Sequence, residues 1–153
     1  RRADDDLKRL FGYNVKTVRE TLNLSRKDVA LETGFMVQYL STTENGTRLP
    51  GLGNILILSQ ALLCKPSTLF QEVDTWAEPR WRFEGPFVSA HEVNKRMKDL
   101  RLAKGLSQGD VMMRTGIHYA HLSEVERGNA NATIPTLMAF CSGMGVNLCD
   151  LID

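Results

Sequence analysis

The apolar positions between residues 107 and 128 predict two short helices joined by a tight turn. Ser107 can cap the first helix, and Gly116, which tolerates a positive φ, can end it. One face of each helix carries apolar side chains that would form a small core. These side chains are Val111 and Met112 in the first helix and Leu122 and Val125 in the second. This is the spacing of a helix-turn-helix unit.

The same pattern occurs earlier in the chain, displaced by 82 residues without a gap. Twelve of the 31 positions from Lys16 to Gly46 are identical to their counterparts. Unrelated sequences would match at roughly two of these positions, so we interpret the chain as an internal duplication of one supersecondary unit. The identical pairs include Ser25 and Ser107, Asp28 and Asp110, Val29 and Val111, Gly34 and Gly116, Leu40 and Leu122, and Glu44 and Glu126.

Helix start and stop signals predict the remaining elements of the first copy. The aspartates at 4–6 can cap a short helix at 7–11, after which Gly12 and Tyr13 lead into a separate helix that Asn23 ends. Further helices are expected after Ser25, from about 37 to 45 and from 52 to 63, with a final turn that Pro66 opens.

The second copy predicts a similar series of elements. Ser89 and Glu92 have the spacing of a capping box before its first helix, in which Val93, Met97 and Leu100 face inward. Its fourth helix follows Pro135 and contributes Leu137, Met138 and Phe140 to the core. We therefore predict an all-α chain with a domain at 1–70, a connector at 71–88 and a second domain at 89–153.

The connector is rich in aromatic residues, which flexible tethers lack. It contains Trp76, Trp81, Phe83 and Phe87 beside Pro79 and Pro86. We expect both tryptophans to be at least half buried and to fix the domains relative to each other. Stacking on nucleic acid is the alternative role for these rings.

The composition is that of an ordinary globular protein, with 42% hydrophobic and 24% charged residues. The sequence has no apolar run of roughly 18 to 20 residues and no signal-peptide pattern. We expect an intracellular, cytoplasmic protein with no membrane partner.

The sequence provides no constellation for metal binding or catalysis. Cys64, Cys141 and Cys149 form no CxxC pair, and His118 and His121 have no third or fourth ligand at a suitable spacing. Neither a nucleophile with a positioned base nor a phosphate-binding loop can be assembled. We expect no metal, no cofactor and no enzymatic activity.

Both copies resemble the helix-turn-helix domain of the Cro and lambda-repressor (XRE-like) family. The resemblance covers about 60 residues at each of two places, and it implies two tandem five-helix bundles that bind double-stranded DNA. The first copy carries it on Val15, Val18, Arg19, Ser25, Val29, Ala30, Gly34, Leu40, Glu44, Gly46, Pro50, Leu62 and Leu69. The second copy carries it on Met97, Arg101, Gly105, Gln108, Val111, Gly116, Leu122, Glu126, Gly128, Gly145 and Leu151.

The resemblance also implies which side chains contact DNA. The start of the second helix would reach phosphates, with Arg26 and Lys27 in the first copy and Gln108 in the second. The outward face of the third helix would meet base edges in the major groove. Its residues are Val37, Gln38, Ser41 and Thr42 in the first copy and Tyr119, Ala120, Ser123 and Glu124 in the second. Arg48 and Arg127, just after these helices, complete the expected DNA-binding set.

The charge distribution favours the first copy as the stronger DNA-holding half. The net charge is +1, but residues 1–70 carry ten Lys or Arg against seven Asp or Glu, whereas residues 90–153 carry seven of each. Phosphate contacts supply most non-specific affinity. In the second copy Met112 replaces the small Ala30, and Glu124 would repel phosphates unless it met a cytosine.

We therefore predict a sequence-specific DNA-binding transcriptional regulator in which the first domain is the main DNA reader. The second domain is either a second reader or a dimerisation domain. The alternative is a protein-interaction module with the same fold, such as an antiactivator, an antitoxin or a phage inhibitor of host defence. A homodimer and a regulatory protein partner are compatible with both interpretations.

Overall fold

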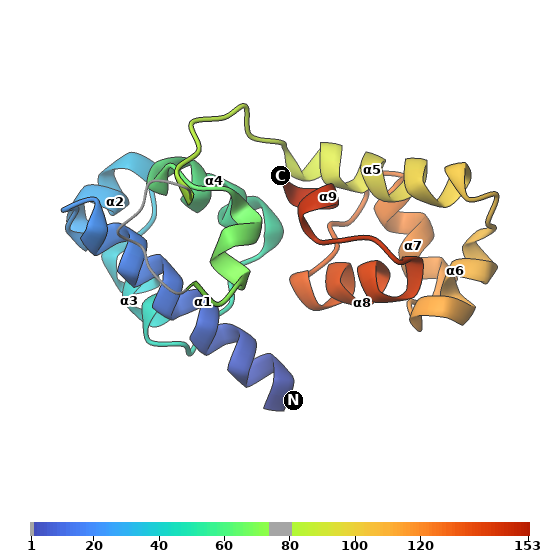
Figure 1. Cartoon of the computed structure of the whole chain (residues 1–153), viewed down its shortest axis with the longest axis horizontal. Coiled ribbons are helices and arrows are strands. Elements are labelled where there is room, and N and C mark those ends of the chain that lie inside the picture. The colour runs from blue at the N-terminus through green and yellow to red at the C-terminus, as the bar shows by residue number, and fades with distance from the viewer. Residues whose placement is uncertain (1, 74–80) are drawn as a thin grey trace. The chain divides into compact units, whose positions relative to one another are not determined.

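The computed structural model describes residues 2–73 and 81–153, which form helices arranged in two compact units. The chain passes from the first unit to the second between Phe87 and Val88, and residues 51–53 are also grouped with the second unit. The first unit contains α1 (Arg2–Thr21), α2 (Arg26–Thr33), α3 (Val37–Glu44), α4 (Leu52–Leu62) and the 3₁₀ helix η1 (Pro66–Phe70) (Figure 1). The second contains α5 (Ala90–Ala103), α6 (Gln108–Thr115), α7 (Tyr119–Glu126), α8 (Ile134–Met144) and α9 (Cys149–Ile152). The predicted all-helical fold is confirmed.

The structural repeat has the register that the sequence predicts. The helices α2, α3 and α4 begin and end 82 residues before α6, α7 and α8. The paired inward positions Val29 and Val111, and Leu40 and Leu122, are all fully buried. In each unit the first helix packs against the third and the last, so one hydrophobic core joins elements from both ends of the unit.

Both helix-turn-helix units begin with the same reciprocal cap. Ser25 Oγ accepts a hydrogen bond from the Asp28 N–H, and the Asp28 carboxylate accepts one from the Ser25 N–H. Ser107 and Asp110 repeat this arrangement. The hydrogen bond from the Ser25 backbone lowers the pKa of Asp28 most, and the hydrogen bond with the Ser25 side chain lowers it further, because both favour the ionised carboxylate.

The predicted helix ends are also confirmed. Gly34 and Gly116 follow α2 and α6 with φ values of 80° and 77°, a left-handed conformation that costs glycine nothing. Asn23, the predicted stop of the first helix, has φ of 59°.

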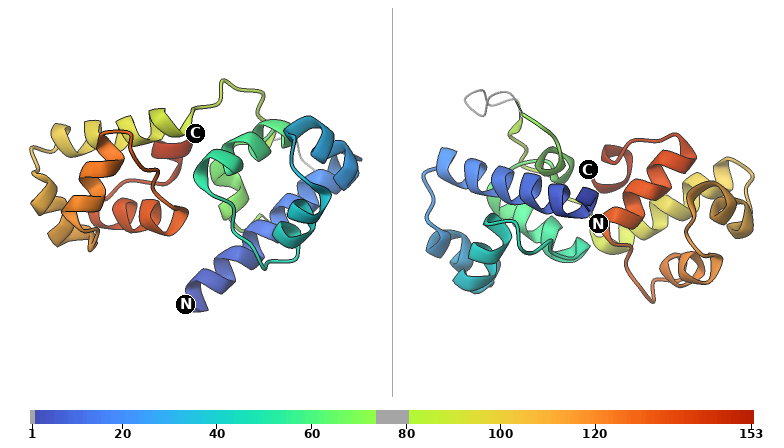
Figure 2. Two further views of the ribbon diagram at one scale, coloured as in Figure 1. Left: turned by 180° about the vertical axis from the view of Figure 1, so that it is seen from behind. Right: turned by 90° about the horizontal axis from the view of Figure 1, so that it is seen from below.

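The predicted break near Gly12 is wrong. Residues 2–21 form one continuous helix, visible from both further directions in Figure 2. Gly12 is buried inside this helix because α3 ends directly against it. A Cβ atom at this position would lie 2.3 Å from the Thr43 carbonyl oxygen. The glycine therefore serves a close approach of two helices, which sequence spacing alone does not distinguish from a helix end.

The predicted core of the second unit needs correction at Met138, and Met112 and Leu100 are half-buried rather than buried. Leu137 and Phe140 are fully buried, but Met138 is 41% exposed. Leu137 and Phe140 stand three residues apart and occupy the inward face of α8, which leaves Met138 on the adjoining face.

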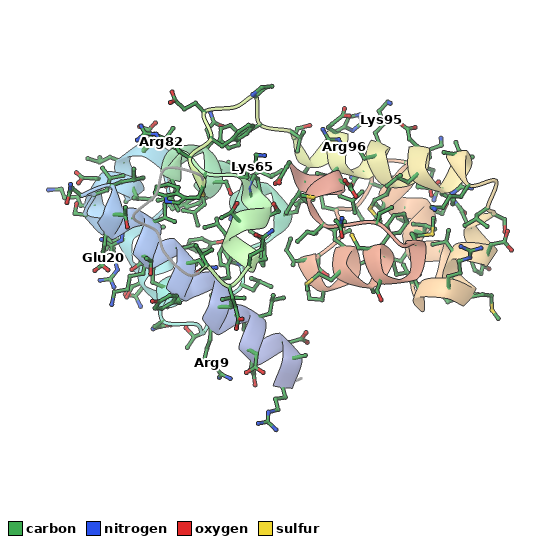
Figure 3. All side chains as sticks on the ribbon, viewed as in Figure 1. Arg9, Glu20, Lys65, Arg82, Lys95 and Arg96 are labelled. Atoms are coloured by element: carbon green, nitrogen blue, oxygen red, sulfur yellow. The ribbon has the colours of Figure 1, made fainter. Side chains whose placement is uncertain are left out.

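The described part of the connector packs on the end of α4. Trp81 is only 9% exposed, which confirms its predicted burial, and the Phe83 N–H donates to the Leu63 carbonyl oxygen at 2.8 Å. Lys65 and Arg82, both labelled in Figure 3, stand on the two neighbouring segments, which Cys64 and Arg82 join in an isolated β-bridge. Trp76 and Pro79 lie outside the described residues. That Trp81 fixes the two domains relative to each other stays a prediction.

Candidate nucleic-acid interface

A threonine hydroxyl fixes the turn of each helix-turn-helix unit. Thr33 Oγ1 donates to the Val29 carbonyl oxygen at 2.8 Å and accepts from the Phe35 N–H at 3.1 Å. Thr115 makes the same two bonds, to Val111 and from Ile117. Three residues therefore suffice to connect α2 to α3 and α6 to α7, because one side chain satisfies backbone groups on both sides of each turn.

A buried ion pair joins the first and third helices of the first unit. Arg19 Nε and Nη2 donate to the Glu44 carboxylate at 2.7 and 3.0 Å, and the two side chains are 9% and 1% exposed. Arg19 Nη1 also donates to the Leu24 carbonyl oxygen at 2.9 Å. The hydrogen bond to Glu44 raises the pKa of Arg19. This bidentate contact orients α3, the helix expected to meet DNA, against α1.

The second unit repeats the ion pair at the corresponding positions. Arg101 Nε and Nη2 donate to Glu126 at 2.7 and 2.8 Å, and Nη1 donates to the Leu106 carbonyl oxygen at 2.8 Å. The sequence repeat includes both arginines and both glutamates but indicates no role for them. An arginine and a glutamate that are identical in the two copies were the feature that could have predicted the ion pair.

The first residue of the second helix in each unit also contacts this glutamate. Arg26 Nε donates to Glu44 Oε1 at 3.0 Å, and Gln108 Nε2 donates to Glu126 Oε1 at 3.2 Å. Both residues were expected to reach DNA phosphates. The Arg26 side chain is 39% exposed, so one part of it is engaged inside the protein while another part faces solvent. Lys27, the other expected phosphate contact, is exposed.

The structure places the four expected base-reading residues of α3 on its solvent side. Val37 and Gln38 are exposed, and Ser41 and Thr42 are half-buried. Thr42 Oγ1 is engaged locally, since it can donate to the Gln38 or Tyr39 carbonyl oxygen and accepts from Arg48 Nε at 3.1 Å. Gln38 is therefore the polar side chain of this face with the greatest freedom to approach a base.

In the second unit the expected DNA-binding residues line one shallow depression of about 380 Å³. They are Gln108, Tyr119, Ala120, Ser123, Glu124 and Arg127. Arg127 forms an ion pair with Glu124 and holds the pKa of that carboxyl below its usual value. The depression is therefore close to electrically neutral.

His118 has a local structural role that sequence analysis missed. Its Nδ1 accepts the Ala120 N–H at 3.1 Å, so the imidazole caps α7, and the ring stacks on Tyr119 with 4.7 Å between centroids. His121 is exposed on the same helix. Among residues 2–73 and 81–153, no group of three or more His, Cys, Asp or Glu side chains is arranged to hold a metal ion.

The two units differ in the cations that surround the second helix of the helix-turn-helix, α3 or α7. In the first unit Lys27 and Arg48 flank α3, and within the described residues neither forms an ion pair with a carboxylate. The corresponding residues of the second unit are Gly109 and Ala130. At these two positions, therefore, only the first unit carries a positive charge.

The paired short helices, their three-residue turns and their exposed second helices define both units as helix-turn-helix domains. The sequence pattern of the helix-turn-helix family matches residues 15–69 and 97–151. The chain belongs to the helix-turn-helix family of Cro and lambda-repressor type, whose members include transcriptional regulators.

Two relatives match 39% of this chain each. The HTH-type transcriptional regulator y4dJ of Sinorhizobium fredii is 37% identical over 60 residues, and the match covers 78% of its length. The HTH-type transcriptional regulator DdrOP3 of Deinococcus deserti is 32% identical over 59 residues, which is 46% of its length. The crystal structure of the restriction-modification controller protein C.AhdI from Aeromonas hydrophila matches 41% of this chain and 96% of its own, with 25% identity and a TM-score of 0.40.

None of the helices in the described residues is both long enough and apolar enough to cross a membrane.

Proposed function

We propose that the chain is a sequence-specific regulator of transcription that binds double-stranded DNA through its first unit. In this proposal α3 enters the major groove, Gln38 reads a base edge, and Lys27 and Arg48 hold phosphates on either side. A helix of this width fits the major groove, and glutamine can make two hydrogen bonds to adenine.

The observation that carries the proposal is the charge around α3. Glu44, the acidic residue at the end of this helix, is 1% exposed and neutralised by Arg19, so it presents no negative charge to a phosphate. Lys27 and Arg48 are exposed cations of this unit that form no ion pair with a carboxylate among the described residues. Attraction to the DNA backbone should therefore be stronger at this unit than at the second.

Replacing Gln38 and Lys27 separately with alanine should distinguish base reading from phosphate holding. We expect Gln38→Ala to relax the preference at one base position, at a cost of about 1 to 3 kcal/mol on the specific duplex. Lys27→Ala should weaken binding to all duplexes alike. It should also lower the slope of log K against log salt by about one, as expected for the loss of one phosphate contact. Lys27 is a cleaner choice than Arg26, because Arg26 also contacts Glu44.

Fluorescence anisotropy with a duplex selected from a random pool, and with a scrambled duplex, measures both effects. An equal loss for Gln38→Ala on the two duplexes would contradict its role as a base reader.

We further propose that the second unit is a dimerisation domain and that a homodimer reads an inverted repeat through two copies of the first unit. The charge balance on α7 supports this division of roles, because Glu124 and Arg127 compensate each other and leave this face little attraction for phosphates. Tyr119→Ala and Ser123→Ala should then leave the DNase footprint unchanged on an inverted-repeat site. Loss of protection over one half of an asymmetric site would instead make the second unit a DNA reader.

The second candidate function is that of a protein-interaction module. The observation that favours it is a pair of exposed apolar side chains at matching positions of α2 and α6, Leu31 at 77% and Met113 at 82% exposure. Such surfaces adapt to protein partners. Stable association with a partner protein, together with no affinity for any duplex in the random pool, would favour this function over DNA binding.

A further inference from the structure

Two neighbours hold the side chain of Arg48, which lies on the loop after α3. Its guanidinium carbon is 4.6 Å from the centre of the Tyr39 ring, and its Nε donates to Thr42 Oγ1 at 3.1 Å. Its backbone N–H donates to the Thr42 carbonyl oxygen at 3.2 Å. A long, exposed arginine ordinarily samples many rotamers, and these contacts restrict the Arg48 side chain to one side of α3.

The Tyr39 ring is itself anchored from two directions. Asn54 Nδ2, on α4, donates to the Tyr39 hydroxyl oxygen at 2.9 Å. The ring of Phe35, in the turn between α2 and α3, lies 5.1 Å from the Tyr39 ring between centroids. The Tyr39 ring, the platform on which Arg48 stacks, therefore contacts both the turn between α2 and α3 and helix α4.

The second unit has none of the residues that build this arrangement. At the positions of Tyr39, Thr42, Arg48 and Asn54 it carries His121, Glu124, Ala130 and Thr136. The backbone of the two units repeats with the same register, so the fold does not require the platform. The stacked Tyr39 ring occurs in the unit that has Lys27 and Arg48 where the other unit has Gly109 and Ala130.

We propose that Tyr39 is a positioning residue for DNA binding, which holds Arg48 in the orientation where its guanidinium meets a phosphate beside α3. This inference rests on the proposed DNA-binding function of the first unit. The charge of Arg48 supplies the attraction, whereas the ring reduces the conformational entropy that the side chain would lose on binding. Removing the ring should therefore weaken binding without changing how many phosphates the protein neutralises.

The test combines affinity with salt dependence in a double-mutant cycle of Tyr39 and Arg48. Fluorescence anisotropy on the selected duplex is recorded at several salt concentrations. Arg48→Ala should lower the slope of log K against log salt by about one. Tyr39→Leu should lower affinity about two- to five-fold, the factor that matches an exposed cation–π contact, and leave the slope unchanged. In the Arg48→Ala background, Tyr39→Leu should have no further effect.

Two further variants distinguish positioning from a general structural role. Tyr39→Phe keeps the ring beneath the guanidinium and should restore the affinity that Tyr39→Leu loses. His121→Leu changes the corresponding residue of the second unit, on which no arginine stacks among the described residues, and should not alter binding. Thermal unfolding by circular dichroism checks that each variant is folded at the assay temperature, and Tyr39→Met, which also lacks an aromatic ring, replaces Tyr39→Leu in the cycle if the leucine variant is not folded.

The outcomes separate this inference from the proposed function. If the wild-type chain binds the duplex but Tyr39→Leu weakens binding equally with and without Arg48, the positioning role is wrong and the DNA-binding function stands. A fall in slope for Tyr39→Leu alone would also overturn the positioning role. If the wild-type chain binds no duplex, both proposals fail.

Discussion

Glu44→Ala should destabilise the first unit by about 3 kcal/mol, because it leaves the buried Arg19 guanidinium without a counter-ion. Arg19 donates twice to this carboxylate, and Arg26 donates to it once. The Glu44 side chain is almost fully buried, so water cannot replace the lost acceptor without opening the contact between α1 and α3.

Guanidinium denaturation followed by circular dichroism measures this loss, and hydrogen exchange locates it. Exchange should accelerate in α1 to α4 and stay unchanged in α5 to α9. Glu32→Ala is the matched control, since Glu32 is exposed on α2, and it should change the free energy of unfolding by no more than about 0.5 kcal/mol. A cost below about 1 kcal/mol for Glu44→Ala would mean that Arg19 is solvated in solution.

Gly12→Ala should cost about 2 kcal/mol, although alanine is the better helix former. The added methyl group would lie 2.3 Å from the Thr43 carbonyl oxygen and 2.8 Å from the Glu44 carbonyl oxygen. Both atoms belong to the backbone at the end of α3, so no side-chain rotation can relieve the overlap. Either α1 and α3 separate, or the Arg19 to Glu44 ion pair is distorted.

Gly53→Ala, in α4, provides the matched control. No atom within 4 Å would meet its added Cβ, so the substitution should stabilise the protein by about 0.5 kcal/mol through helix propensity. Thermal melts of the two variants should therefore shift in opposite directions. A melting temperature for Gly12→Ala at or above that of the wild type would show that α1 and α3 do not approach this closely.

Local sequence signals predicted most of the helix boundaries correctly. The cap at Ser25, the left-handed Gly34 and the stop at Asn23 all depend on residues within one turn of the chain, and each repeats or has a counterpart 82 residues later. The structure adds the reciprocal bond from the Ser25 N–H to Asp28. Such signals act through hydrogen bonds and backbone conformations that a few neighbouring residues decide.

The candidate site was predicted less completely, because its chemistry depends on contacts between distant residues. The exposed positions of Val37 and Gln38 followed from helical periodicity. The attachment of Arg26 to Glu44 spans 18 residues, and the stacking of Arg48 on Tyr39 depends on the course of a loop. No periodic pattern encodes either contact.

The tandem repeat of helix-turn-helix domains could be recognised from the amino-acid sequence alone, since hydrophobic periodicity, caps and turn glycines are local and occur twice in the same register. The folded structure was needed to show that Gly12 lies inside a helix, that Glu44 is buried between α1 and α3, and that Arg48 stacks on Tyr39. These features depend on how closely separate helices approach, and the close packing of the core sets that distance.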